Sequence, residues 1–248
     1  MNADEFWVEV FNAERKAPTD GVDCPECLNR GVIARIGADG YVRMVECDCK
    51  KKRSQARLSR LTGIPEAASK KMTFETFDIK AEWQGKMFEC AENFLISDAA
   101  ILFLGGQTGC GKTHLGVAVS NAAVRAGIQT LMISWPAASK SLKSKANSPE
   151  YFEEIAVYKN AGLLFIDDFL SAGGAPSSAD LSIAAEIVSE RLALRRRMII
   201  CSPYTLRELY HLNSKISGEI YEHAKGFYFN IVHDTSKDFR LKSKGVQG

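Results

Sequence analysis

The chain has 248 residues, of which 46% are apolar and 25% charged, with a formal net charge of +2. This composition is typical of a globular protein with one large domain and an appendage, or with two modest domains. The sequence contains no run of 18 apolar residues, so it predicts no transmembrane helix. The N-terminus lacks the pattern of a signal peptide, and seven cysteines without one favour a reducing compartment. We therefore expect a cytoplasmic protein.

The charge is unevenly distributed along the first third of the chain. Residues 1–20 carry five acidic and two basic side chains, a net charge of −3, whereas residues 50–71 carry eight basic side chains and one acidic, a net charge of +7. This asymmetry indicates that the two segments contact different partners.

The first predicted element is a short amphipathic helix over residues 4–15, ending before Pro18. Its apolar residues recur at the spacing of one helical face. They are Phe6, Trp7, Val10 and Phe11. Such a helix either packs on the rest of this chain or enters a groove of a partner protein.

Four cysteines follow, arranged as C-x2-C, nineteen residues, and C-x-C. They are Cys24, Cys27, Cys47 and Cys49. Between the pairs, the alternating stretches 32–36 and 41–45 flank a Gly-Ala-Asp-Gly turn and predict a β-hairpin. Because a hairpin brings its ends together, the four thiolates are expected to bind one structural Zn²⁺, with free thiols as the alternative. The metal would supply folding free energy to a short segment.

A basic helical stretch then runs from Lys50 to about Leu61, and Gly63-Ile64-Pro65 ends it. It either follows a nucleic-acid backbone or is a solvated linker, and no aromatic residues are interleaved to decide between these. The domain junction is expected at about residues 62–72.

Apolar strands alternate with helices in the remainder of the chain. The expected strands are 100–104, 130–133, 163–166, 198–201 and 227–232, and the expected helices are 83–96, 112–126, 135–145, 150–159 and 179–195. This alternation predicts an α/β fold with a mostly parallel sheet that helices cover on both faces. Three further cysteines, Cys90, Cys110 and Cys201, are expected to be small apolar fillers.

The first strand leads into Gly-Gln-Thr-Gly-Cys-Gly-Lys-Thr at residues 106–113, a full match to G-x-x-x-x-G-K-[ST]. In this motif the backbone N–H groups surround phosphate oxygens at a helix N-terminus. Lys112 is expected to pair with the β- and γ-phosphates, and the Thr113 hydroxyl to bind Mg²⁺. The expected nucleotide-contacting set is Gly106, Gln107, Thr108, Gly109, Cys110, Gly111, Lys112, Thr113 and His114.

Polar residues follow two later strands. Asp167 and Asp168 end the strand Leu163–Ile166, 54 positions after Thr113. Because the carboxyl ends of parallel strands share one edge of a sheet, both carboxylates are expected beside the phosphate loop. Asp167 would hold Mg²⁺ and Asp168 would orient the attacking water. Ser202, after the strand 198–201, either senses the γ-phosphate or belongs to a Ser-Pro turn.

With these strand ends in this order, residues 62–242 resemble the DnaC/DnaI-type bacterial or phage helicase loaders, AAA+ ATPases allied to the IstB transposition ATPases. The other shared features are Gly63-Ile64-Pro65, Met72–Phe77 (similar to "tFenF"), Arg191 on the helix after the acidic pair, and Asp238-Phe239-Arg240 (similar to "syR"). The resemblance implies that Arg240 contacts the nucleotide as a sensor-II arginine. It also implies a P-loop AAA+ core without a C-terminal helical lid, since eight residues follow Arg240.

The resemblance further implies an ATPase that uses ATP and Mg²⁺ to load a hexameric replicative helicase of the DnaB type onto single-stranded DNA in replication initiation, with self-association. The expected organisation is a partner-binding helix in 1–20, a zinc module in 21–50, a basic linker in 51–68 and the AAA+ domain in 69–248. The family places a single-strand-binding insertion near Trp135–Lys145, which contains Lys140, Lys143 and Lys145. Trp135 would stack on a base or be buried.

The sequence departs from the family pattern at two places. Pro203 replaces the asparagine of the "TSN" strand, and the segment 218–223 has no arginine where the family's "GERI..R" carries one that completes a neighbour's site. Because such an arginine accelerates hydrolysis strongly, hydrolysis without a partner is expected to be slow. The alternative functions are an IstB-like transposition regulator, an ATP-switch adaptor or inhibitor of the helicase, and a small-molecule P-loop kinase.

Overall fold

The computed structural model describes residues 2–16, 23–49, 63–171, 173–234 and 237–238. The chain divides into two compact units, residues 1–61 and 62–248. Within the described residues, no helix is long and apolar enough to cross a membrane. The predicted basic helix at 50–61 and the predicted sensor Arg240 lie outside the described residues.

The described part of the N-terminal unit contains helix α1 and a β-hairpin. Helix α1 (Ala3–Ala13) starts with a capping box between Asn2 and Glu5, and β1 (Val32–Ile36) pairs antiparallel with β2 (Val42–Glu46). The predicted hairpin between the cysteine pairs is therefore present.

Helix α1 packs on the hairpin through its last turn. The Asn12 side chain donates to the carbonyl oxygen of Ala34 and accepts from its N–H, both at 2.9 Å. The guanidinium of Arg30 lies 3.2 Å from the centroid of the Phe11 ring, a cation–π contact. Helix α1 is thus a folded part of the N-terminal unit, and Phe6, Trp7 and Val10 in its first two turns stay exposed.

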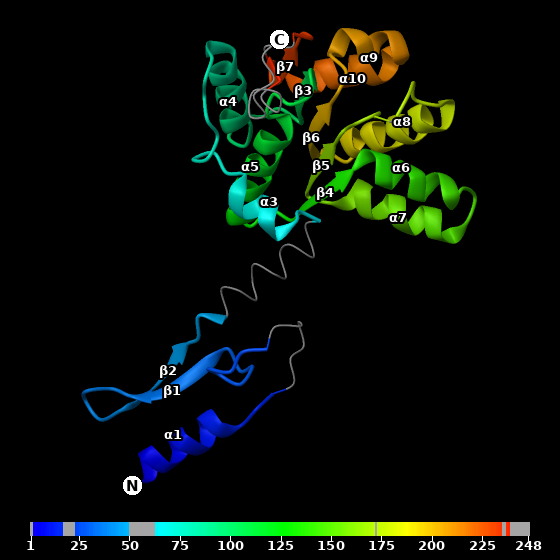
Figure 1. Ribbon diagram of the computed structural model, residues 1–248. Helices are drawn as coiled ribbons and strands as arrows, with labels where there is room; N and C mark the ends of the chain where they lie inside the picture. The colour runs from blue at the N-terminus through cyan, green and yellow to red at the C-terminus, as the bar shows by residue number, and fades with distance from the viewer. Residues whose placement is uncertain (1, 17–22, 50–62, 172, 235–236, 239–248) are drawn as a thin grey trace. The chain divides into compact units, whose positions relative to one another are not determined.

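The larger unit is a five-stranded sheet with helices on both faces (Figure 1). Its elements are α3 (Glu66–Lys71), α4 (Glu82–Phe94), β3 (Ile101–Gly106), α5 (Lys112–Arg125), β4 (Thr130–Ser134), α6 (Trp135–Ser144), α7 (Pro149–Asn160), β5 (Leu163–Asp167), α8 (Ser178–Ala193), β6 (Arg197–Ser202), α9 (Leu206–Leu212), α10 (Ser214–Ala224) and β7 (Tyr228–Ile231). The strand order is β4-β5-β6-β3-β7, and every pairing is parallel. The predicted α/β fold is confirmed. Among the described residues, no α-helix follows β7.

The strands are apolar because both faces of the sheet are buried. Successive residues of β3 face opposite sides: Ile101 and Phe103 join the core under α6–α10, whereas Leu102 and Leu104 join the core under α4 and α5. On the second face, α5 approaches the sheet so closely that a Cβ at Gly116 would lie 2.4 Å from the Phe165 ring. This close approach fixes the helix that follows the phosphate loop against β5.

Arg191 on α8 is fully buried and connects α7 to β6. Its Nη1 donates to the carbonyl oxygens of Tyr158 (2.7 Å), Lys159 (3.0 Å) and Ala161 (2.9 Å) at the end of α7, and its Nη2 donates to that of Arg197 at 2.6 Å. Carbonyl groups at a helix C-terminus have no partner within the helix. Arg191 satisfies them and thereby holds α7 against the sheet.

We expect Arg191→Ala to lower the free energy of unfolding by about 3 kcal/mol or more, because several buried carbonyl groups lose their donor. Arg195→Ala, at an exposed arginine just after the same helix, is the control and should change stability by less than about 0.5 kcal/mol. Urea denaturation followed by circular dichroism measures both. Equal stability of the two variants would contradict this role.

Candidate functional site

The phosphate loop joins β3 to α5, and its glycines adopt conformations that other residues avoid. Gly106, Gly109 and Gly111 have φ values of +101°, +74° and +99°. A Cβ at Gly106 would lie 2.0 Å from the carbonyl oxygen of Ile231, and one at Gly111 would lie 2.7 Å from the Phe77 ring. Glycine is therefore required here both by backbone conformation and by the close approach of β7 and of the segment before α4.

Lys112 is buried at the start of α5, with its side chain turned back along the loop. Its Nζ donates to the carbonyl oxygens of Gly106 at 2.8 Å and of Gln107 at 2.5 Å. Cys110 is also buried, its Sγ lies 2.9 Å from the same Gln107 oxygen, and burial raises the pKa of its thiol. The ammonium group thus lies at the loop that the sequence assigns to a triphosphate, whereas Cys110 packs as a neutral thiol.

The acidic strand end meets the helix after the loop, as the sequence predicts. The Thr113 hydroxyl donates to Oδ1 of Asp167 at 3.0 Å. Burial, together with the neighbouring charge of Asp168, raises the pKa of Asp167 to about 6. A hydroxyl and a carboxylate held together offer the oxygen ligands that Mg²⁺ prefers, so the pair fits this ion.

Asp168 lies in the short turn after β5, and Ser202 lies at the end of the neighbouring strand β6. Asp168 is exposed and has a left-handed φ of +54°. Ser202 is fully buried; its hydroxyl donates to the carbonyl oxygen of Phe169 at 2.9 Å and accepts from the N–H of Tyr204 at 3.1 Å. The hydroxyl of Ser202 is thus bonded to the turn that carries Asp168.

Two other residues of the expected nucleotide-contacting set hold neighbouring segments. Gln107 accepts from the N–H of Asp234 at 2.9 Å through its Oε1, and its own N–H donates to Ile231 at 3.0 Å. His114 has its Nε2 2.9 Å from the carbonyl oxygen of Thr73, and its ring stands edge-to-face against Phe77 at 5.2 Å. The side chain of His114 therefore fixes the segment 72–77 beside the loop, a role that the motif alone did not indicate.

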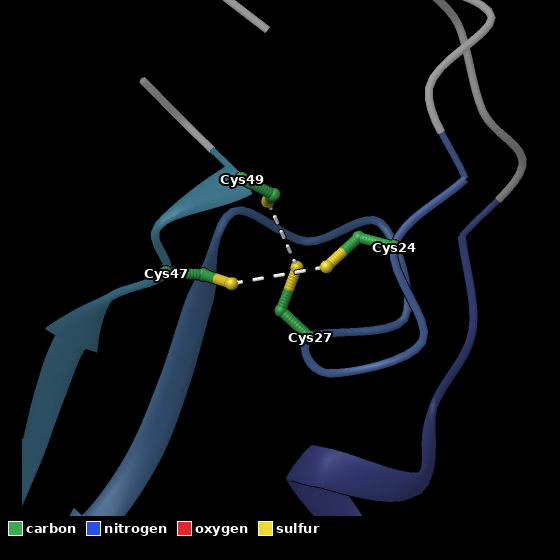
Figure 2. Close-up of side chains that lie close together, drawn as sticks. All are labelled: Cys24, Cys27, Cys47 and Cys49. Atoms are coloured by element: carbon green, nitrogen blue, oxygen red, sulfur yellow. Dashed lines mark hydrogen bonds between the residues drawn. The ribbon is translucent and has the colours of Figure 1, made fainter. Parts of the chain in front are cut away.

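The four N-terminal cysteines converge on one point (Figure 2). Their side chains are buried, and all four Sγ atoms lie within 4.8 Å of one another. The Sγ atoms of Cys24 and Cys47 are 3.8 Å apart, and those of Cys27 and Cys49 are 3.3 Å apart. Zn–S bonds of about 2.3 Å in a tetrahedron place sulfurs about 3.8 Å apart, so the cluster fits Zn²⁺.

The segment that the resemblance associates with DNA is largely committed to contacts within the protein. Trp135 is fully buried and packs edge-to-face on Phe169 at 5.1 Å, so the packing interpretation is correct and the base-stacking one is wrong. Lys143 pairs with Asp180 at 2.7 Å and Lys145 with Glu154 at 2.6 Å. Lys140 is exposed and makes no ion pair with any described residue.

Asp180 joins α8 to α6 from a buried position. It accepts hydrogen bonds from Ser139, from Lys143 at 2.7 Å and from the N–H of Ser177 at 2.9 Å. Burial alone would raise the pKa of Asp180, but the bonds from Lys143, Ser139 and Ser177 hold it well below the usual 3.8. The charged carboxylate therefore stabilises the contact between the two helices.

This low pKa predicts a pH-dependent part of the stability. The contribution of Asp180 is fully present above the unfolded-state value of 3.8, and it is lost as pH falls through the lower folded-state pKa. We expect the free energy of unfolding to fall as the pH drops below about 4, and we expect Asp180→Asn to show a weaker fall. Denaturant titration across this range tests it, with the exposed Asp78→Asn as control. An unchanged slope in Asp180→Asn would contradict the assignment.

Comparison with solved structures shows the fold at low sequence identity. DnaA from Aquifex aeolicus bound to AMPPCP is 22% identical with a TM-score of 0.56, covering 72% of this chain and 57% of that one. DnaI is 19% identical (TM-score 0.56, 69% and 95% covered), and a DnaC helicase loader is 20% identical (TM-score 0.56, 66% and 97% covered). The chain thus spans little more than half of the DnaA structure.

A comparison with curated proteins finds no match. The family described as IstB-like ATP binding protein matches residues 26–212, or 187 of the 248 residues. This match includes the phosphate loop, both aspartates and Ser202. The chain belongs to the IstB-like ATP-binding family of AAA+ proteins and shares its fold with DnaC, DnaI and DnaA.

Proposed function

We propose that this protein hydrolyses ATP to load a hexameric replicative helicase onto single-stranded DNA. The observation that supports this most is the contact between Thr113 and Asp167 beside Lys112, at one edge of the sheet. A second support is the fold, which this chain shares with a DnaC helicase loader over 97% of that structure.

The residues of this edge have complementary roles in hydrolysis. Lys112 binds the β- and γ-phosphates, and Thr113 and Asp167 hold Mg²⁺, which neutralises phosphate charge when bound. Asp168 orients a water molecule. The water oxygen bonds to the γ-phosphorus while the bond to the β–γ bridging oxygen breaks, and the water proton passes through Asp168 to the products, ADP and inorganic phosphate.

Helix α1 supplies the surface for a protein partner. Phe6, Trp7 and Val10 are 56%, 48% and 53% exposed, although α1 is fixed to the hairpin by Phe11 and Asn12. A fixed helix with an exposed apolar stripe is suited to a groove of another protein. Acidic residues beside the stripe, among them Glu9, favour a groove with a basic rim.

Contacts with DNA phosphates are assigned to Lys140, with the basic segment 50–60 as the second candidate. Lys143 and Lys145 are weaker candidates because carboxylates already pair with them. Alanine replacement of Lys140 should weaken binding to all single-stranded sequences about equally and reduce its salt dependence.

The family match also favours a second function, regulation of transposition, in which a transposase replaces the helicase as partner. A third candidate, an ATP-switch adaptor, follows from Pro203 and from the absence of arginine in residues 218–223. Such a protein would bind ATP and its partner without appreciable turnover.

One set of measurements separates these functions. Phosphate release is measured with single-stranded DNA and a hexameric helicase, each alone and together, and helicase capture is measured with and without ATP. A loader shows ATP-dependent capture and stimulated release. Capture without stimulated release favours the adaptor, and a lack of capture together with stimulation by a transposase favours the transposition regulator.

A further inference from the structure

The turn after β5 has an unusual backbone. Asp168 and Leu170 both have left-handed φ values, +54° and +62°, although neither is glycine. The N–H of Ser171 donates to the carbonyl oxygen of Asp168 at 2.8 Å and closes the turn. Aspartate tolerates this conformation, but leucine rarely adopts it, so contacts outside the turn must hold the backbone at Leu170.

Phe169, between the two left-handed residues, provides those contacts. Its N–H donates to the carbonyl oxygen of Cys201 at 2.8 Å, and its carbonyl oxygen accepts from the Ser202 hydroxyl at 2.9 Å. Its ring is fully buried and packs edge-to-face on Trp135, with centroids 5.1 Å apart. The turn is therefore attached to the end of β6 by two hydrogen bonds and to α6 by a ring contact.

Ser202 also lies next to the strand that enters the phosphate loop, because it is paired with Gly105 of β3 in the parallel register. One residue thus touches both the turn that carries Asp168 and the strand that carries the loop. Its single hydroxyl proton is directed to Phe169, and its oxygen already accepts from Tyr204. This bonding differs from that of a hydroxyl directed at a phosphate.

We propose that Ser202 is a positioning residue for Asp168: by holding the Phe169 carbonyl it keeps the backbone of Asp168 in the left-handed conformation from which its carboxylate orients water. The inference rests on the proposed ATP hydrolysis. It places the influence of Ser202 in the catalytic step, because the hydrogen bonds of its hydroxyl go to Phe169 and Tyr204, whereas Lys112, Thr113 and Asp167 have other partners among the described residues.

Ser202→Ala tests this in single-turnover hydrolysis. We expect the rate of the chemical step to fall about tenfold, as for the loss of one buried hydrogen bond, with the Kd for ATP changed less than about twofold. Ser202→Thr, which keeps the hydroxyl, should restore most of the rate. The matched control is Ser217→Ala, another buried serine, whose Oγ donates to Leu206 at 2.8 Å on α9; its rate should be unchanged.

A double-mutant cycle shows whether the effect passes through Asp168. In an Asp168→Asn background, Ser202→Ala should cost little further rate, because the carboxylate that it positions is already gone. An equal loss in both backgrounds, or a loss of ATP affinity as large as the loss of rate, would overturn the proposal.

Amide hydrogen exchange tests the same contact without turnover. Residues 167–171 should exchange about tenfold faster in Ser202→Ala than in wild type and Ser217→Ala. If the wild type hydrolyses no ATP under any condition, the proposed function fails, and unchanged exchange in this segment then separately overturns the positioning role.

Discussion

Lys112→Ala is expected to abolish measurable ATP binding, a loss of about 100-fold or more in affinity. Its ammonium group is the cation of the loop, and charged hydrogen bonds to two phosphates contribute about 1.5–3 kcal/mol each. Titration with a fluorescent ATP analogue measures the affinity. Because Lys112 is buried and bonded to Gly106 and Gln107, the variant's thermal unfolding must be measured beside it.

Lys86→Ala is the matched control for this experiment. Lys86 is an exposed lysine on α4 that pairs with Glu82, so its removal should leave ATP affinity within about twofold of wild type. ATP affinity retained in a folded Lys112→Ala variant would remove the phosphate-loop assignment, and with it the proposed function.

Removal of zinc is expected to unfold the N-terminal unit. A four-thiolate zinc site contributes about 10–16 kcal/mol of binding free energy, which is also free energy of folding. The two strands of the hairpin have five residues each, and the core of this unit consists of the four cysteines with Ile33 packed against them, so little else stabilises it. The contact between Arg30 and Phe11 ties α1 to this unit, so α1 should lose its amide protection together with β1 and β2. Metal analysis and hydrogen exchange before and after chelation measure both effects.

Cys27→Ser should reproduce the effect of chelation, whereas Cys90→Ser should retain one zinc per chain, because Cys90 lies on α4 and is not one of the four clustered cysteines. Protected amides in β1 and β2 of a metal-free protein would show that the cysteines act as free thiols.

The sheet and the meeting of Thr113 with Asp167 could be predicted because they follow from general rules. Apolar strands between helices pair in parallel, and the carboxyl ends of parallel strands share an edge. The burial of Trp135 is also predictable from the sequence, because Trp135, Ala138 and Leu142 follow the i, i+3, i+7 spacing of a buried helix face.

Other features depend on tertiary contacts or on short signals. Helix α9 has only seven residues, and its one local signal is the capping box of Thr205 and Glu208. The partner of the Ser202 hydroxyl could not be predicted, because the left-handed residues Asp168 and Leu170 include no glycine to mark the turn. The pattern of polar residues at strand ends identified Ser202, but its hydrogen bond to the Phe169 carbonyl oxygen depends on tertiary packing.

The hydrogen bonds of Asn12 have a consequence for how the N-terminal unit meets other chains. A two-stranded ribbon has open edges onto which foreign strands can add by β-augmentation, which is also a route to aggregation. The amide of Asn12 imitates a neighbouring strand and occupies both backbone groups of Ala34. Strand addition is thereby blocked at this point of β1, so a partner that approaches this side meets the helix instead.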